Sequence, residues 1–533
     1  MKYASLINEP TPQTEPLSRR QVENNAGGFV FTLDNWARLE RFLILGSDAP
    51  TYYQKAPDLT RENAQCVIAC WDEDPARALD VITRISLEGR APKNDPAIFA
   101  LALGAAHQDQ RVRQVALSGV VAVCRTGTHL FQFVKAARAL GRGWGRSMKR
   151  AVGYWYNSKP IDALSYQLIK YREREGYSHR RLMQTAHPDP KAGHSGSTKD
   201  KEARIELYKW VWGKDVAAKK LPPLVQAHLE AMASVTTKRA RIKLIQDHRL
   251  PWEAIPTECN SDPDYWEAQL PTVGLTALIR NLGSLSRIGL LKPLSEAEKV
   301  IAERLSDVGE LKRARIHPFN VLVALKTYQS GRGFRGSNTW TPSQKIVSVL
   351  DKSFYTTFKN VEPSGRRFLF GLDVSGSMSS LMQGTNLSCC EAAAALALVT
   401  MNVEPRTYTF GFASSFVDLK IREGDTLEQA TKKAQRSNFG STDCSVAMAH
   451  ALANKIEVDC FVVITDNETY AGRSHPSAVL QKYRRKMNPK AKLVVCGLTS
   501  TGFSIADPQD AGQLGCVGFD TSMPAVISDF ARR

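Results

Sequence analysis

The spacing of apolar residues changes once along this chain, and that change limits the folds it can adopt. From about Asp34 to Leu325, apolar residues recur at helical intervals, as in "DPARALDVITRISLEGRAP" and "HLFQFVKAARALG". Gly, Pro or Asp separates these blocks, and such residues are typical of helix ends. The pattern predicts stacked helix pairs, an α-solenoid of the HEAT type, although no crisp sequence repeat is present.

Beyond a Gly- and Ser-rich segment at 328–343, strand-like and helix-like runs alternate. "RRFLFGLDV", "TYTFGFAS", "VDCFVVITD" and "AKLVVCGLTS" are typical of buried strands, and helical patterns lie between them. This order predicts a doubly wound α/β domain with a parallel sheet, covered by helices on both faces. We therefore expect two domains, an all-α domain over residues 1–360 and an α/β domain over residues 361–533.

Positive charge is concentrated in the first of these parts. Of 71 Lys and Arg and 53 Asp and Glu, residues 361–533 hold 18 and 17, which leaves residues 1–360 with 53 bases and 36 acids. An excess of 17 positive charges on one part favours a polyanionic partner, with nucleic acid as the leading candidate. A basic surface that serves only solubility is the alternative.

Cysteine usage and hydropathy indicate a cytoplasmic protein. The ten cysteines show no CxxC pair and no zinc-ligand spacing, as expected of reduced thiols. No apolar run approaches the roughly 20 residues that cross a bilayer, and the first twenty residues lack the apolar core of a signal peptide. We expect no membrane association.

One short motif follows a predicted strand of the α/β domain, at the carboxyl edge of the sheet where ligands bind in such domains. "DVSGSMS" follows the first predicted strand, and two later loops, "FGSTDCS" and "VVITDNET", lie at or beside the carboxyl ends of strands. Two carboxylates and three hydroxyls meeting at one sheet edge would suit Mg²⁺, which prefers oxygen ligands. The expected ligands are Asp373, Ser375, Ser377, Thr442 and Asp466.

The same residues do not form a recognisable enzyme centre. Neither Ser375 nor Ser377 has the flanking glycines of a nucleophile elbow. An aspartyl-phosphate enzyme would need an acid where Ser375 stands, and two-metal hydrolysis needs more carboxylates. The bland alternative is a serine-rich turn that binds no metal.

The densest basic segment runs from Lys135 to Arg181, with 12 Lys and Arg against 3 acids. Cationic groups can hold phosphates, while aromatic rings can stack on unpaired bases. Helix-core packing is the alternative for Tyr154, Trp155 and Tyr156, and local pairing with Glu173 and Glu175 is the alternative for Arg172 and Arg174. A second basic loop with Arg332 and Arg335 either lines an RNA path or is a flexible linker.

Several segments together resemble a known family. "RRQVENNAGGFVF", "ARLERFLILGSDAPTYY", "KYREREGYSHRRLMQTAHP" and "ARIHPFNVLVALKTY" are similar to the TROVE domain of Ro autoantigen proteins, and the "NNAGGFVF" opening is closest in character to bacterial members. The C-terminal part resembles a von Willebrand factor A domain with its metal-ion-dependent adhesion site. The resemblance spans nearly the whole chain.

The resemblance implies a monomeric ring of HEAT-like helices closed by the A domain. It also implies that a small non-coding Y RNA binds a basic outer surface, and that misfolded or 3′-ended single-stranded RNA enters a central hole for quality control. Exoribonucleases such as polynucleotide phosphorylase would be tethered through Y RNA. The RNA-binding candidates are Lys170, Arg172, Arg174, His179, Arg180, Arg181 and His187 by motif, and Arg125, Arg146, Lys149 and Arg150 by charge and position.

Three functional hypotheses remain at this point. The first is a non-enzymatic RNA-binding protein. The second is an adhesion-type protein scaffold that works through the metal site, with the basic part secondary. The third is a metal-dependent ribonuclease, which the missing catalytic residues disfavour.

Overall fold

The computed structural model describes most of the chain and divides it into two compact units. The described residues are 22–23, 29–30, 35–45, 51–53, 59, 61, 64–88, 93–193, 197–333, 338–382, 385–412, 416–435, 443–465, 474–498, 506–507, 510, 512–517 and 523–532. One unit comprises Leu59–Glu303, and the other joins Met1–Asp58 to Arg304–Arg533. The predicted boundary near residue 360 separates helical from α/β sequence, whereas the contacts divide the chain near residues 58 and 303.

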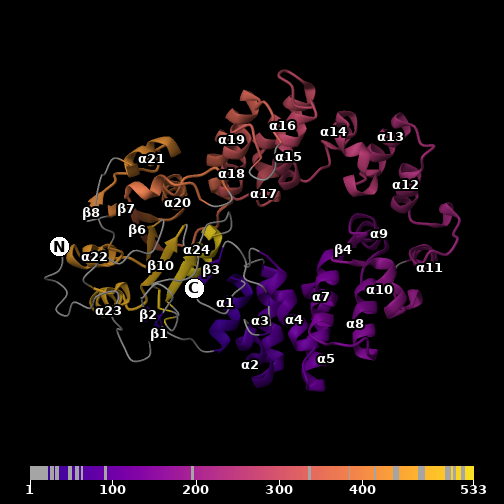
Figure 1. Ribbon diagram of the computed structural model, residues 1–533, viewed down its shortest axis with the longest axis horizontal. Coiled ribbons are helices and arrows are strands. Elements are labelled where there is room, and N and C mark those ends of the chain that lie inside the picture. The colour runs from indigo at the N-terminus through magenta and orange to yellow at the C-terminus, as the bar shows by residue number, and fades with distance from the viewer. Residues whose placement is uncertain are drawn as a thin grey trace. The chain divides into compact units, whose positions relative to one another are not determined.

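The unit from Leu59 to Glu303 is built from helices (Figure 1). Local signals start many of them, such as the Thr126 and Ser178 hydroxyls, which accept backbone N–H groups in the first helical turn. Its helices are α2 Gln65–Glu73, α3 Pro75–Glu88, α4 Asp95–Ala105, α5 Gln110–Ser118, α6 Val120–Val123, α7 Gly127–Ala139, α8 Arg146–Asn157, α9 Ile161–Lys170, α10 His179–Ala186, α11 Thr198–Val211, α12 Pro223–Met232, α13 Lys238–His248, α14 Pro263–Gln269 and α15 Leu275–Arg287.

A buried histidine links four of these helices. His179, the first residue of α10, is 3% exposed, and its Nε2–H donates to the carbonyl of Gln167 in α9 (3.2 Å). Its Nδ1 accepts from the hydroxyl of Tyr156 in α8 (3.0 Å), so the ring is neutral and a single tautomer satisfies both bonds. A Cβ on Gly127, at the start of α7, would lie 2.8 Å from this ring. Only glycine therefore lets α7 approach so closely.

Four more helices connect the two sequence regions. They are α16 Glu296–Ser306, α17 Val308–Arg313, α18 Pro318–Gln329 and α19 Gln344–Thr356, and α1 Asn35–Leu45 precedes them in the chain. Helices α18 and α19 pack against each other. Trp340, in the segment between them, stacks on Tyr328 with the ring centroids 6.3 Å apart. Part of the Gly-rich segment is therefore anchored to the core.

The α/β region is formed around a seven-stranded sheet with the order β3-β11-β10-β9-β6-β7-β8. All neighbouring strands are parallel except β8, which runs antiparallel to β7. The strands are β3 Thr51–Tyr53, β6 Arg367–Asp373, β7 Arg406–Phe412, β8 Phe416–Asp418, β9 Cys460–Thr465, β10 Lys492–Gly497 and β11 Gln513–Val517, and the helices are α20 Cys389–Val403, α21 Leu427–Gln435, α22 Val446–Ala453, α23 Pro476–Lys486 and α24 Met523–Arg532.

The predicted order, a helical part followed by an α/β domain, is confirmed, with two differences in the sheet. Strand β8 makes one pairing antiparallel, and β3 comes from the N-terminal region, where it pairs with β11 through Cys516 and Tyr52. The helical spacing of "QRVRQVALSGVVAVCR", residues 110–125, predicts one helix, but the segment forms α5 and α6. The division falls at Gly119, where a Cβ would lie 2.5 Å from Leu79 Cδ1.

Both faces of the sheet are buried at its centre, whereas β8 at one edge is largely exposed. All six residues of β9 are buried, as expected of a parallel sheet with helices on each side. Leu369 in β6 joins a core cluster with Val479 and Tyr483 from α23, whereas α20 also contacts β6. Because successive side chains alternate between faces, Phe368 and Phe370 point away from that cluster. The register pairs Leu372 with Ile464, which places Asp373 beside Thr465 at the carboxyl edge.

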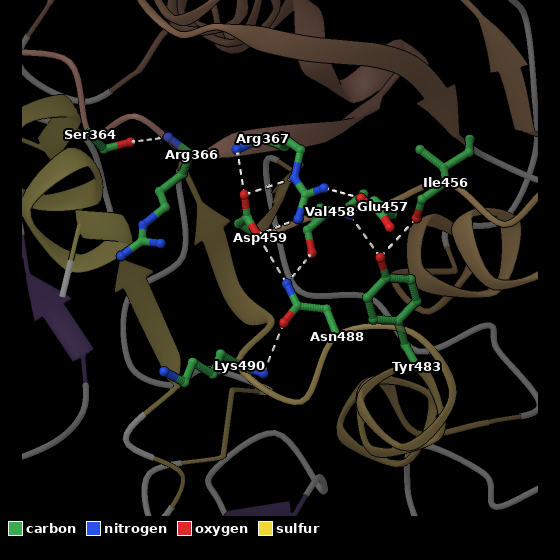
Figure 2. Close-up of polar contacts among 10 residues, drawn as sticks. All are labelled: Ser364, Arg366, Arg367, Ile456, Glu457, Val458, Asp459, Tyr483, Asn488 and Lys490. Carbon is green, nitrogen blue, oxygen red and sulfur yellow. Dashed lines mark hydrogen bonds and ion pairs between the residues drawn. The ribbon is translucent and has the colours of Figure 1, made fainter.

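Polar contacts fasten the opposite edge, where β6 and β9 begin (Figure 2). The Arg367 guanidinium donates to both carboxylate oxygens of Asp459, at 3.0 and 2.9 Å, and lowers the pKa of that carboxyl. Asn488 donates to Asp459 Oδ1 (2.9 Å), and the Tyr483 hydroxyl accepts from the backbone N–H of Val458 (2.7 Å). Charge-assisted contacts of this kind fix the register at this end of the sheet.

The cysteine and membrane predictions can be compared directly with the structure. All ten cysteines are free and buried, including Cys66 and Cys70 on α2. A buried free cysteine packs as a small apolar side chain. In the described part of the chain, no helix is long and apolar enough to cross a bilayer.

The buried histidine generates a pH prediction. Burial lowers the pKa of His179 from its usual 6.5 to about 3, so the unfolded chain takes up a proton first as the pH falls. The stability that depends on the neutral ring is fully present above pH 6.5 and is lost as the pH falls toward 3. At pH 5 the loss should reach up to about 2 kcal/mol.

Urea unfolding at pH 7.5 and pH 5, followed by tryptophan fluorescence, checks this prediction, because seven of the nine tryptophans lie in the helical unit. In a His179→Gln variant, the difference in unfolding free energy between the two pH values should shrink. His248→Gln, at an exposed histidine of α13, is the matched control and should keep the full difference. An unchanged difference in His179→Gln would contradict the prediction.

Candidate nucleic-acid interface and metal site

The segment expected to bind RNA by motif contains a β-hairpin. Helix α9 ends at Lys170, and β4 Glu173–Arg174 pairs antiparallel with β5 Tyr177–Ser178. Glu175 and Gly176 both have positive φ, of 57° and 75°, as the tight hairpin turn requires. The apolar spacing of "PIDALSYQLIKYRERE" predicts one helix through Glu175, and this prediction is wrong, because the helix ends at Lys170 and the residues after it form the hairpin.

The carboxylate of Glu175 in the hairpin turn does not pair with the neighbouring arginines. Glu175 pairs with Lys135 of α7 at 2.6 Å. Arg172 and Arg174 are exposed, and no carboxylate among the described residues lies within ion-pair distance of either guanidinium. Local neutralisation, the alternative weighed for these arginines, is absent from this part of the structure. Both charges are available to an external anion.

Helix α10 adds two exposed arginines next to the hairpin. The Arg181 guanidinium lies 5.2 Å from the centre of the Tyr177 ring. Arg180 lies over Gly213, where a Cβ would come within 2.6 Å of the guanidinium. His187, which follows the helix, is exposed and has a left-handed backbone, with φ of 49°. Arg181 is thus placed against the hairpin by Tyr177, while Arg180 and His187 are exposed elsewhere on α10 and just after it.

His179 differs from the other motif residues because its ring is buried. Its two hydrogen bonds go to Tyr156 and Gln167, and neither nitrogen faces solvent. Direct contact with RNA does not agree with this burial. The residue instead holds α10 against α8 and α9, and thereby positions Arg180 and Arg181.

Lys170 lies at the edge of a small hollow of about 110 Å³. Its ammonium group donates to the Tyr166 hydroxyl (2.9 Å) and lies 5.7 Å from the centre of the Tyr171 ring. Trp252 and Glu253 also line the hollow. Lys170 is thus a partly buried cation held among aromatic rings, and its orientation is restricted.

The residues chosen by charge and position fall into two groups. The Arg125 guanidinium donates to the carbonyl and the hydroxyl of Ser86, both at 2.8 Å, so it also links α3 to the end of α6. Arg146 and Arg150 are exposed on α8, and Lys149 is partly exposed beside them. Sequence spacing alone could not distinguish Arg125, which links two helices, from Arg146 and Arg150, which are exposed on α8.

The aromatic residues of α8 divide in the same way. Trp155 and Tyr156 are fully buried, which agrees with their interpretation as core residues, whereas Tyr154 is 62% exposed. In the second basic loop, Arg332 belongs to the described residues and Arg335 lies outside them. Of the aromatic residues weighed on α8, Tyr154 is the one whose ring is open to solvent.

The metal motif begins where β6 reaches the carboxyl edge of the sheet. Asp373 is 1% exposed, and its Oδ1 accepts from the backbone N–H of Ser375 (2.8 Å). Its Oδ2 accepts from the hydroxyl of Thr465 (2.7 Å), the last residue of β9. The hydroxyl oxygens of Ser375 and Ser377 lie 2.9 Å apart. Oxygen atoms from β6, its loop and β9 therefore gather at one point.

The predicted ligands that the structure describes, Asp373, Ser375 and Ser377, have the type of donor atom that a hard cation prefers. Their donors are carboxylate and hydroxyl oxygens, the ligand type that Mg²⁺ prefers. The predicted ligands Thr442 and Asp466 lie outside the described residues, although Asp466 directly follows Thr465 in sequence. In the described ranges, this site included, no group of three His, Cys, Asp or Glu side chains could hold a metal ion.

Sequence reasoning did not identify Thr465. Its side chain is completely buried and orients the Asp373 carboxylate across the β6–β9 pair. A polar residue at the end of the apolar run "CFVVIT" was the available signal. In the sequence, the neighbouring Asp466 already supplies the expected carboxylate, so Thr465 does not stand out as a site residue.

Comparisons with known proteins identify both sequence regions. A TROVE domain matches residues 22–230 and 219–330, and a Ro60 vWA domain matches residues 367–531. The RNA-binding protein RO60 of Deinococcus radiodurans is 42% identical over 527 residues, covering 98% of this chain and 97% of that protein. The RNA-binding protein RO60 of Caenorhabditis elegans is 34% identical, covering 97% and 91%.

A solved structure shows the same fold. The crystal structure of the Deinococcus radiodurans RO (RSR) protein matches with a TM-score of 0.83 and 40% sequence identity, over 93% of this chain and 99% of that one. The domain order, the near full-length identity and the structural match agree with one another. This chain therefore belongs to the Ro family, with a TROVE domain followed by a Ro60-type von Willebrand factor A domain.

Proposed function

We propose that this chain binds RNA without cutting it, and that a structured small RNA of the Y RNA type docks on the surface made by Lys170, the β4–β5 hairpin and α10. The observation that supports the proposal is the set of exposed arginines there with no carboxylate partner among the described residues. Unpaired guanidinium groups bind phosphates strongly, and Arg181 on Tyr177 adds a flat surface.

The RNA would be captured for quality control in the cytoplasm. Misfolded RNAs and RNAs with single-stranded 3′ ends are the proposed targets, and a bound Y RNA would tether an exoribonuclease such as polynucleotide phosphorylase. The chain itself would act as a monomer and supply binding alone. Incubation with labelled RNA and Mg²⁺ should leave the RNA intact, and its progressive shortening would establish a nuclease instead.

A double variant tests the docking surface. Lys170→Ala with Arg174→Ala should weaken binding of a synthetic stem-loop RNA about tenfold or more at 0.15 M salt, because two phosphate contacts are lost. The slope of log affinity against log salt should also become shallower by up to about two units. Fluorescence anisotropy over a series of salt concentrations measures both quantities.

Two exposed lysines of the α/β region provide the matched control. Lys486→Ala with Lys490→Ala removes the same net charge from α23 and the loop after it, outside the proposed surface. This control should bind within about twofold of the wild-type protein. Equal losses in both double variants would show that binding follows net charge and not this surface.

We also propose that Asp373, Ser375 and Ser377, together with Thr442 and Asp466, hold Mg²⁺. Bound there, the ion would supply a positively charged centre for an acidic group of a partner. The buried Asp373 carboxylate, fixed by Thr465 and by the Ser375 backbone, supports this proposal. A protein scaffold that works through this site remains the second candidate function, favoured by the exposure of Ser377 at the surface.

Two neighbouring serines test the metal proposal. Ser377→Ala should weaken Mn²⁺ binding, measured by calorimetry, about tenfold or more, because a direct ligand is lost. Ser379→Ala should leave it unchanged, since that hydroxyl donates to the carbonyl of Gly376 (2.7 Å) and is not an expected ligand. RNA affinity should not change in either variant. Loss of RNA binding in Ser377→Ala alone would favour the scaffold hypothesis or a shared site.

A further inference from the structure

A basic groove between α5 and α8 is not part of the surface assigned above. The two helices contact each other in the helical unit (Figure 1), and the hollow between them has a volume of about 840 Å³. Arg113, Arg142, Arg146 and Arg150 all line it. None of the described residues that line the groove is acidic. Four cations therefore face one space without a carboxylate among its lining residues.

Helical spacing brings these side chains into line. Arg146, Arg150 and Tyr154 stand four residues apart and occupy one face of α8. Arg113 and Leu117 have the same spacing on α5. Each helix thus presents a charged position near its N-terminal end and an apolar or aromatic position about one to two turns further on. The groove is polar at one end and apolar at the other.

The charged end lacks a counterion within the described structure. Burial lowers the pKa of Arg142, and the nearby charge of Arg113 lowers it further. Arg142 donates to the Ser147 hydroxyl (2.7 Å), but its Nε is buried and has no hydrogen-bond partner. Helix α8 also begins here, at Gly145, without a side-chain cap on its first N–H groups. All of these groups would be stabilised by an anion with several acceptor oxygens, and a phosphate has that chemistry.

The other end is suited to a nucleobase. Leu117, Val121 and Ala151 give it an apolar lining, and Tyr154 exposes 62% of its surface beside them. An exposed aromatic ring next to unneutralised arginines is the usual platform for an unpaired base, whose flat face stacks on the ring. A base inside a duplex has no free face to offer. The combination therefore favours single-stranded over double-stranded RNA.

We propose that the α5–α8 groove binds a short unpaired segment of RNA, with a phosphate at Arg113, Arg142 and Arg146 and a base stacked on Tyr154. The inference rests on the proposed RNA-binding function and deepens it by assigning unpaired nucleotides to a site of their own. The docking surface around Lys170 and α10 would then hold structured RNA, while the groove takes a neighbouring loop or tail.

The test uses the full-length protein and two RNA probes. One is an eight-nucleotide RNA without self-complementarity, and the other is a blunt duplex of twenty base pairs. Tyr154→Ala should weaken binding of the octamer at least fivefold, whereas Tyr154→Phe, which keeps the stacking ring, should bind within about twofold of wild type. Arg146→Gln with Arg150→Gln should weaken octamer binding about tenfold or more. Duplex affinity should change by less than twofold in Tyr154→Ala.

Three results separate this inference from the proposed function. If the wild-type protein binds the stem-loop RNA but Tyr154→Ala and the double arginine variant bind the octamer as wild type does, the groove proposal is wrong and the RNA-binding function stands. If wild-type protein binds none of the RNAs, both fail. Equal losses for octamer and duplex in Tyr154→Ala would also overturn the groove, because they would indicate a general structural defect, which circular dichroism would reveal.

Discussion

The burial of a neutral imidazole is the constraint on which the arrangement of the candidate RNA surface depends. His179 is buried, yet its two nitrogens satisfy a hydroxyl from α8 and a carbonyl from α9, while Gly127 brings α7 against the ring. Burying a polar ring costs much less folding free energy when both of its nitrogens are hydrogen-bonded than when only one is. The four helices α7, α8, α9 and α10 are therefore held in one arrangement around His179. The exposed arginines of α10 and the groove residues of α8 both lie on helices that contact this residue.

The candidate sites in the two parts of the chain are formed in different ways. In the α/β region, the register of parallel strands brings Asp373 and Thr465 together, although 92 residues separate them in the chain. In the helical unit, Arg172 and Arg174 are exposed at the β4–β5 hairpin, and no carboxylate among the described residues pairs with them. A strand end concentrates a few oxygens at a point, whereas a helical surface distributes charge over an area that suits a long polyanion.

Periodicity was enough to predict the domain order, the buried strands and the position of Asp373 at a strand end. It was not enough for the hairpin at residues 173–178, because "KYRERE" has good helix formers, and only the structure shows that α9 ends at Lys170 and that Glu175 and Gly176 form a turn. Nor could charge counting separate His179 and Arg125, whose side chains link helices, from Arg172 and Arg174, which have no carboxylate partner among the described residues. Thr465 and the facing stripes of α5 and α8 become visible only when distant segments are brought together.

Strand β3 has a consequence for how the chain reaches its native state. Thr51–Tyr53 is synthesised well before its partner strand, Gln513–Val517, because the whole helical unit lies between them in the chain. This pairing has a very large sequence separation, and contacts of that kind form slowly because a long loop must close first. Until β11 is in place, β10 is an unprotected sheet edge. A chain in which β11 has not yet paired is therefore exposed to aggregation along β10, and a chain truncated before residue 513 could not complete this sheet.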